Sequence, residues 1–184
     1  LHYPGTGVGG LCIPVYPRII IEDALKIGKS MNLLEYSRKI NDEMPKKCVN
    51  NSVKMLRKNK IKVKNAKIAV LGLGFRGEVT DTRLSPTYDV VNEFLKKGCK
   101  VSVHDPYIFE DDDLPKSVLL TQNLKEILKD VDLIFISSDH KIYSKINSKL
   151  LKQKKSILLF DGRNILDPKL LSNGILNTIG IGKK

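Results

Sequence analysis

The residues best suited to chemistry lie near the start of the chain, where a cysteine follows a glycine-rich segment. Gly5, Gly7, Gly9 and Gly10 precede Cys12. Glycines permit sharp turns and close approach of a ligand, and main-chain N–H groups of such a loop can converge on an anion or a sugar hydroxyl. A cysteine presented there could attack a bound carbonyl group. A turn beside a buried structural cysteine would show the same spacing, so spacing alone leaves both interpretations open.

A second glycine motif, GLGFRG, occupies residues 72–77. It fits the GxGxxG pattern that follows a strand and binds a dinucleotide, and Asp105 could then bind the ribose. Two features weaken that interpretation. Asp105 lies farther along than the usual spacing of about 20 residues. The residues after Gly77 are polar and loop-like, although a pyrophosphate should meet the amino terminus of a helix.

The elements that must position these motifs are short apolar runs alternating with helical patterns. Such alternation predicts an α/β fold with a doubly wound parallel sheet. The expected strands cover 68–71, 101–103, 133–136, 157–160 and 176–181, and the helical stretches lie near 86–98, 123–130 and 140–151. Ahead of them, residues 18–60 predict helix, broken near 28–32, with Pro45 as a kink or a helix start.

Bulk properties narrow the class of protein. The chain has 184 residues and a formal charge of +12, enough length for one compact domain plus an appendage. Because it begins at Leu1 inside a motif, we interpret it as the carboxy-terminal part of a longer protein. Its lysines are scattered and lack interleaved aromatic residues, which favours solvated helix faces over a nucleic-acid partner. A positive field would also suit a diphosphate-bearing substrate.

The cysteines indicate a compartment and exclude a common metal site. Cys12, Cys48 and Cys99 form no CxxC pair and no cluster with histidine, so we expect no metal, and an odd number of cysteines fits a reducing cytoplasm. We expect Cys48 and Cys99 to be packing residues. No apolar run reaches the roughly 18 residues of a membrane span, and we expect no membrane association.

Four ordered segments resemble one known family. YPGTGVGGLCIPVYP (3–17) resembles the active-site cysteine segment of the nucleotide-sugar 6-dehydrogenases of the UDP-glucose/GDP-mannose dehydrogenase family. The other matches are LGLGFRG with DTRLSP (71–77 and 81–86), VHDPY (103–107) and DGR (161–163). The Cys-Ile-Pro-Val sequence is most similar to the branch that oxidises UDP-N-acetyl-D-mannosamine, because the UDP-glucose branch more often has lysine at the position of Val15.

The resemblance implies an organisation in two parts. Residues 1–64 would be the end of a central helical domain carrying the cysteine, and residues 65–184 a Rossmann-like UDP-sugar-binding domain. An NAD-binding domain would precede them, so the fragment alone should be inactive. The long helix would contribute to a homodimer or higher homo-oligomer. In this family the second glycine motif belongs to the UDP-binding domain, and we favour that assignment over a NAD site.

The resemblance also implies roles for individual residues. Cys12 would be the catalytic nucleophile. The expected substrate-binding residues are Tyr3, Gly5, Gly7, Gly9, Phe75, Arg76 and Arg163, with main-chain donors of the first segment meeting the sugar. The expected NAD contacts are Cys12, Val15 and Arg83. Arg76 stands where the family has lysine, which keeps the charge and changes the donor geometry.

The implied reaction oxidises the C6 alcohol of UDP-N-acetyl-D-mannosamine to the uronate with two NAD and one water. Cys12 would retain the aldehyde as a thiohemiacetal and then a thioester. Tyr16 replaces an aspartate that helps to position the hydrolytic water, and Leu11 replaces a histidine common in this branch. The alternatives are a UDP-glucose 6-dehydrogenase and a truncated, non-catalytic UDP-binding module.

Overall fold

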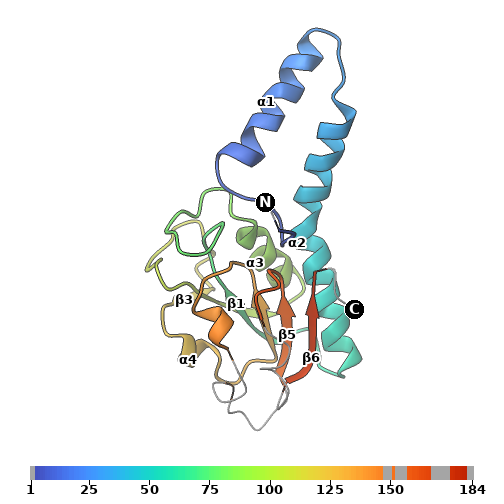
Figure 1. Ribbon diagram of the computed structural model, residues 1–184. Helices are drawn as coiled ribbons and strands as arrows, with labels where there is room; N and C mark the ends of the chain where they lie inside the picture. Colours follow the sequence, from blue (N-terminus) through green and yellow to red (C-terminus); the bar gives the residue numbers. More distant parts are fainter. Residues whose placement is uncertain (1–2, 147–150, 152–156, 167–174, 182–184) are drawn as a thin grey trace.

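The computed structural model describes residues 3–146, 151, 157–166 and 175–181, with the backbone alone for 175–179. In this described part, six strands form one parallel sheet in the order β3-β2-β1-β4-β5-β6 (Figure 1). The strands are β1 Lys67–Leu71, β2 Lys100–His104, β3 Leu119–Thr121, β4 Leu133–Ile136, β5 Ile157–Asp161 and β6 Ile175–Gly180.

Both faces of the sheet are covered, which explains why its central strands read as uninterrupted apolar runs. Helices α2 (Asn32–Lys58) and α3 (Pro86–Lys96) pack on one face, where Phe135 lies 4.9 Å from Phe160 and 5.6 Å from Phe94 between ring centroids. The short helix α4 (Leu124–Ile127) and the 3₁₀ turn η1 (Tyr143–Lys145) contribute to the core on the other face. The doubly wound α/β prediction is confirmed.

Helix α1 (Cys12–Lys26) and α2 form a hairpin that extends away from the sheet (Figure 1). The predicted break near residues 28–32 is confirmed, but α1 begins at Cys12 rather than at residue 18. Pro14 occupies the first turn, where no intrahelical N–H bond is required, and Pro17 removes one bond farther in. Pro45 lies inside α2 without ending it.

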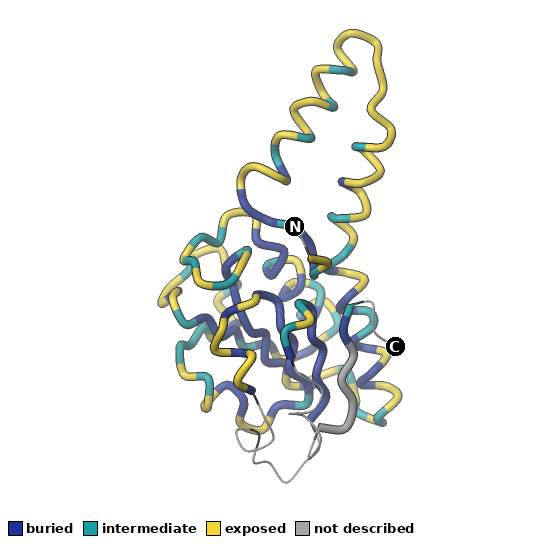
Figure 2. Tube along the Cα trace, in the orientation of Figure 1, coloured by how far each residue is buried: buried dark blue, intermediate teal, exposed yellow. Residues whose placement is uncertain are grey.

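Helix α2 has two environments along its length (Figure 2). Its first turns, including Leu33 and Tyr36, are exposed, whereas Cys48, Val49 and Leu56 are buried in the core under the sheet. One continuous helix therefore anchors the projecting hairpin. No helix in the described ranges combines the length and apolarity that a membrane crossing requires.

Three local predictions differ from the structure. The helix near 123–130 is confined to 124–127, and Asp130 has a φ of 56° that ends the turn. Within 140–151, the described residues contain only the turn at 143–145, while 147–150 lie outside them. Strand β3 had no counterpart among the expected strands, because its three residues at the sheet edge are too few to give a period.

Candidate active-site cleft

The cleft lies at the carboxyl ends of the central strands. The chain order reverses between β1 and β4, and such a point in a parallel sheet leaves a crevice for ligands. A cleft of about 320 Å³ there is lined by residues from the amino-terminal segment and from the loops after β1, β4 and β5, namely Tyr3, Gly7, Val8, Gly9, Ile13, Phe75, Arg76, Asp139 and Arg163. The structure thus brings together the residues expected to bind the sugar nucleotide.

The glycines of the amino-terminal segment allow close packing against these loops. A Cβ atom at Gly5 would lie 2.6 Å from Nη1 of Arg163, and one at Gly9 would lie 2.8 Å from Cβ of Phe75. The Val8 N–H donates to Oδ1 of Asn41 at 2.8 Å. The segment is therefore fixed partly through its own main-chain donors, and the expectation that its donors meet a ligand does not hold for Val8.

Two cationic side chains and one aromatic ring line the same cleft. Cζ of Arg76 lies 5.7 Å from the centroid of the Phe75 ring, a cation–π contact that restrains both side chains. Arg163 follows β5, and its backbone N–H donates to Oδ1 of Asp161 at 3.0 Å. Guanidinium groups are suited to phosphate oxygens because they can donate two parallel hydrogen bonds. The cleft can accordingly bind an anion next to a flat ring.

Asp139 is a cleft residue that sequence reasoning missed. Its Oδ2 lies 3.2 Å from Nη2 of Arg163, and its Oδ1 accepts the Gly77 N–H at 2.8 Å. Burial acts to raise the pKa of Asp139, but the Gly77 hydrogen bond and the Arg163 charge outweigh it and lower the pKa. The available signal was its place three residues after the apolar run at 133–136, where the carboxyl end of a parallel strand faces the crevice.

The loop that carries Phe75 and Arg76 rests on a buried carboxylate. Oδ2 of Asp105 accepts the N–H groups of Leu73 at 2.8 Å and Gly74 at 3.1 Å, and its Oδ1 accepts the Tyr107 N–H at 2.9 Å. Nε2 of His140 lies 3.2 Å from Oδ2. Asp105 is thus committed to the protein backbone. The ribose role that a dinucleotide motif would assign to it has no support in this geometry.

His140 extends this support to the end of the loop. Its ring is buried, and its Nδ1 accepts the Glu78 N–H at 3.1 Å, which leaves Nε2 to donate to Asp105. Burial acts to raise the pKa of Asp105, but the bonds from His140 and the backbone N–H groups prevail and lower it. The loop from Leu73 to Glu78 is therefore held by the buried Asp105 carboxylate at its start and by His140 at its end.

Cys12 is the first residue of α1 and has an exposed, free thiol next to the cleft-lining Ile13. Its segment is tied to the loop after β1 through the Gly10 N–H, which donates to the Arg83 carbonyl at 3.0 Å. The pKa of Arg83 is raised by the hydrogen bond and charge of Asp81. The Gly10 bond brings the segment that leads into Cys12 against the main chain at Arg83.

The other two thiols are inert by comparison. Cys48 and Cys99 are buried, and burial raises their pKa to about 12 and about 11 respectively. Cys99 also donates its S–H to the Val63 carbonyl at 3.4 Å. Their burial agrees with the packing role expected for them and leaves Cys12 as the accessible nucleophile among the described residues.

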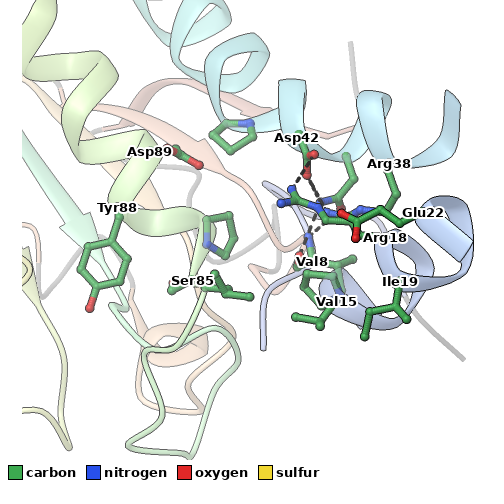
Figure 3. Close-up of a pocket in the computed structure, with 15 residues that line it drawn as sticks. Val8, Val15, Arg18, Ile19, Glu22, Arg38, Asp42, Ser85, Tyr88 and Asp89 are labelled. Carbon is green, nitrogen blue, oxygen red and sulfur yellow. Dashed lines mark hydrogen bonds and ion pairs between the residues drawn. The ribbon is translucent and has the colours of Figure 1, made fainter. Parts of the chain in front are cut away.

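Val15 lines a different hollow from the residues that are expected to bind the substrate (Figure 3). A cavity of about 580 Å³ lies between α1, α2 and the start of α3, and Val15 and Leu84 line it. On the same side as Val15, Asp42 pairs with Arg18 at 3.0 Å and with Arg38 at 2.5 Å (Figure 3). Of the three residues expected to contact NAD, Val15 lines this cavity, whereas Cys12 and Arg83 do not. Across the described ranges, no three histidine, cysteine or acidic side chains gather to hold a metal ion.

Comparison with known proteins agrees with this arrangement. The model of the UDP-glucose/GDP-mannose dehydrogenase family's UDP-binding domain matches residues 69–168, and that of the family's central domain matches residues 1–43. The chain is 32% identical over 167 residues to the UDP-N-acetyl-D-mannosamine dehydrogenase of Pyrococcus horikoshii, covering 90% of this chain and 37% of the relative.

Solved structures show the same likeness. The NDP-N-acetyl-D-galactosaminuronic acid dehydrogenase of Methanosarcina mazei superposes with a TM-score of 0.88 at 29% identity, over 100% of this chain and 40% of that one. The UDP-D-ManNAc dehydrogenase of Pyrococcus horikoshii gives 0.82 at 31% identity, over 99% and 40%. The chain belongs to the UDP-glucose/GDP-mannose dehydrogenase family, and it spans 37–40% of the length of these relatives.

Proposed function

We propose that this chain is the part of an NAD-dependent UDP-sugar 6-dehydrogenase that binds the sugar nucleotide and supplies the catalytic cysteine. The sugar would be N-acetyl-D-mannosamine, as the names of the relatives suggest. In this proposal residues 1–64 end the central domain and residues 65–184 bind UDP. The observation that carries it is the exposed, free thiol of Cys12, which directly precedes Ile13 in the lining of the cleft that presents Arg76 and Arg163.

The cleft suits a nucleoside diphosphate attached to a sugar. Arg76 and Arg163 offer positive charge for the diphosphate, and Phe75 offers a flat apolar surface. Tyr3, Gly7 and Gly9 line the same cleft, and Gly5 leaves the space that the Arg163 guanidinium occupies. A substrate held in this cleft would have its sugar near the segment that ends in Cys12.

The thiol of Cys12 accounts for retention of the aldehyde between two oxidations. Oxidation of the C6 alcohol releases a hydride and a proton and leaves an aldehyde, whose carbon the Cys12 sulfur attacks to form a thiohemiacetal. Loss of a second hydride and a proton gives a thioester. Water then attacks the thioester carbon, the C–S bond breaks, and the carboxylate and the free thiol are released.

The residues near Cys12 fit one edge of a nicotinamide site. NAD, when bound, accepts the hydride released in each oxidation. Arg83 carries an exposed positive charge that pairs with Asp81, and its carbonyl accepts the Gly10 N–H of the segment leading into Cys12. Val15 gives an apolar wall one turn farther along α1. Cys12, Val15 and Arg83 would therefore hold the cofactor on the outer side of the cysteine segment.

Two further features support details of the proposal. Tyr16 is exposed and lies four residues after Cys12, on the same face of α1, and a phenol is a poor base at neutral pH. Hydrolysis of the thioester should therefore be the slow step. The exposed apolar residues of the hairpin, such as Ile20 and Leu33, support an assembly with further copies of the chain.

The test replaces Cys12 by serine in the complete protein. Cys12→Ser should abolish formation of the uronate, detected by mass spectrometry, and Cys99→Ser is the matched control because that thiol is buried beyond the amino-terminal end of β2. UDP-N-acetyl-D-mannosamine, UDP-N-acetyl-D-glucosamine and UDP-glucose are compared by NADH absorbance. Wild-type turnover in Cys12→Ser would contradict the mechanism, and UDP binding without any turnover in the wild type would favour a non-catalytic module.

A further inference from the structure

The cleft contains a carboxylate at a place where a negative charge would repel a bound diphosphate. Asp139 lines the same hollow as Arg76 and Arg163, and its charge cancels part of theirs. A negative group at this place repels a bound anion, and it weakens anion binding unless another of its contacts offsets this repulsion. The contacts of Asp139 show what that contribution is.

Asp139 connects two loops that follow different strands of the sheet. Its Oδ1 holds the backbone N–H of Gly77, next to Arg76 on the loop after β1, and its Oδ2 holds Nη2 of Arg163 on the loop after β5. The side chain of Asp139 is 40% exposed and that of Arg163 is 18% exposed. The pair is thus half-buried, unlike the freely exposed surface pairs that contribute little.

The Arg163 guanidinium is restrained from its other side as well. A Cβ atom at Gly5 would lie 2.6 Å from Nη1 of Arg163. The Arg163 guanidinium group lies between the amino-terminal segment at Nη1 and the Asp139 carboxylate at Nη2. These two contacts fix the plane that the guanidinium presents to the cleft. An arginine with many rotamers loses less entropy on binding when it is already held in this way.

We propose that Asp139 is a positioning residue for the diphosphate, acting through Arg163. It orients the guanidinium and couples the Arg76 loop to the Arg163 loop, so that both bind the ligand as one unit. This inference rests on the proposed binding of a UDP-sugar in the cleft. It goes beyond that function by assigning a role to an acidic residue of the site.

Removal of a repelling charge would raise the affinity for UDP, whereas loss of positioning would lower it, so one measurement distinguishes the two. Asp139→Asn keeps an oxygen for the Gly77 N–H and removes the negative charge. If Asp139 only repels the ligand, UDP should bind more tightly to this variant. If Asp139 positions Arg163, UDP should bind about tenfold more weakly, the size of one charge-assisted hydrogen bond. Asp112→Asn, on an exposed loop, removes the same charge elsewhere as the matched control.

The experiment measures UDP affinity by isothermal titration calorimetry for the wild type, Asp139→Asn, Asp112→Asn, Arg163→Gln and the double variant Asp139→Asn/Arg163→Gln. The weakening caused by Asp139→Asn should disappear in the Arg163→Gln background, since the residue acts through Arg163. A general loosening of the fold would persist there. Hydrogen exchange of the Gly77 amide is followed in parallel and should stay slow in Asp139→Asn and become fast in Asp139→Ala.

Each outcome decides one of the two claims. Tighter or unchanged UDP binding in Asp139→Asn, or a loss that persists without Arg163, overturns the positioning role and leaves the proposed function intact. Absence of UDP binding to the wild-type chain overturns the proposed function, and with it the role of Asp139. Weakening that requires Arg163 supports both.

Discussion

The buried carboxylate of Asp105 offers the most quantitative test of how the cleft is built. Asp105→Asn is nearly isosteric, but the introduced amide has one acceptor oxygen where the carboxylate has two. Oδ2 accepts from Leu73, Gly74 and His140, whereas Oδ1 accepts from Tyr107 alone. The best placement of the amide therefore directs its NH₂ group at the Tyr107 N–H.

The cost follows from this count of bonds. Loss of the Tyr107 hydrogen bond, with the amide NH₂ now facing the Tyr107 N–H, costs about 1–3 kcal/mol. The remaining hydrogen bonds also lose the acceptor charge that makes them about twice as strong as neutral ones. We expect Asp105→Asn to lower the free energy of unfolding by about 2–4 kcal/mol. This is a large share of the roughly 5–15 kcal/mol of a typical domain.

The assay is urea unfolding at pH 7, repeated at lower pH. The pKa of Asp105 in the folded protein is lowered from 3.8, so its stabilisation is present above about pH 4 and is lost as the pH falls through the folded pKa. The difference between wild type and variant should therefore shrink on acidification. A difference below about 0.5 kcal/mol at pH 7, the range of surface substitutions, would refute the hydrogen-bond account.

Two further predictions concern the cysteine segment. Iodoacetamide at pH 8 should alkylate Cys12 well before Cys48 and Cys99, whose burial raises their pKa to about 12 and about 11, and peptide mass spectrometry would show the order; equal rates would contradict the burial of the other two. Asn41→Ala should cost about 1 kcal/mol and speed hydrogen exchange at the Val8 amide, while Asn41→Asp, which keeps the acceptor, should leave that amide protected.

Much of the sheet could be predicted because its central strands are buried on both faces. Runs such as 133–136 and 157–160 consist of consecutive apolar residues, a pattern typical of the central strands of a parallel sheet. Strand β3 and the turn at 143–145 escaped prediction because each has three residues, too few for a pattern to repeat. The early start of α1 was missed because the helical pattern was recognised only from residue 18, although a first turn accepts a proline such as Pro14.

The cleft could be predicted as a set of residues but not as a geometry. Arg163 and Phe75 were identified from their motifs, and they do line one hollow. Asp139 carried no motif, and its importance depends on two partners more than 20 residues away in sequence, Gly77 and Arg163. Likewise Asp105 resembled a ligand-binding acid until its hydrogen bonds to the backbone were seen. Side-chain partners of this kind depend on tertiary contacts that no local pattern encodes.

The double environment of α2 has a consequence for any shortened version of the protein. A chain trimmed to the part that begins at β1 would lose Cys48, Val49 and Leu56, which form one wall of the apolar core. The exposed underside of the sheet would then be open to water and prone to aggregation. A shortened chain that keeps the core of the sheet covered must therefore retain the second half of this helix, and a cut at the proposed border after residue 64 would remove it.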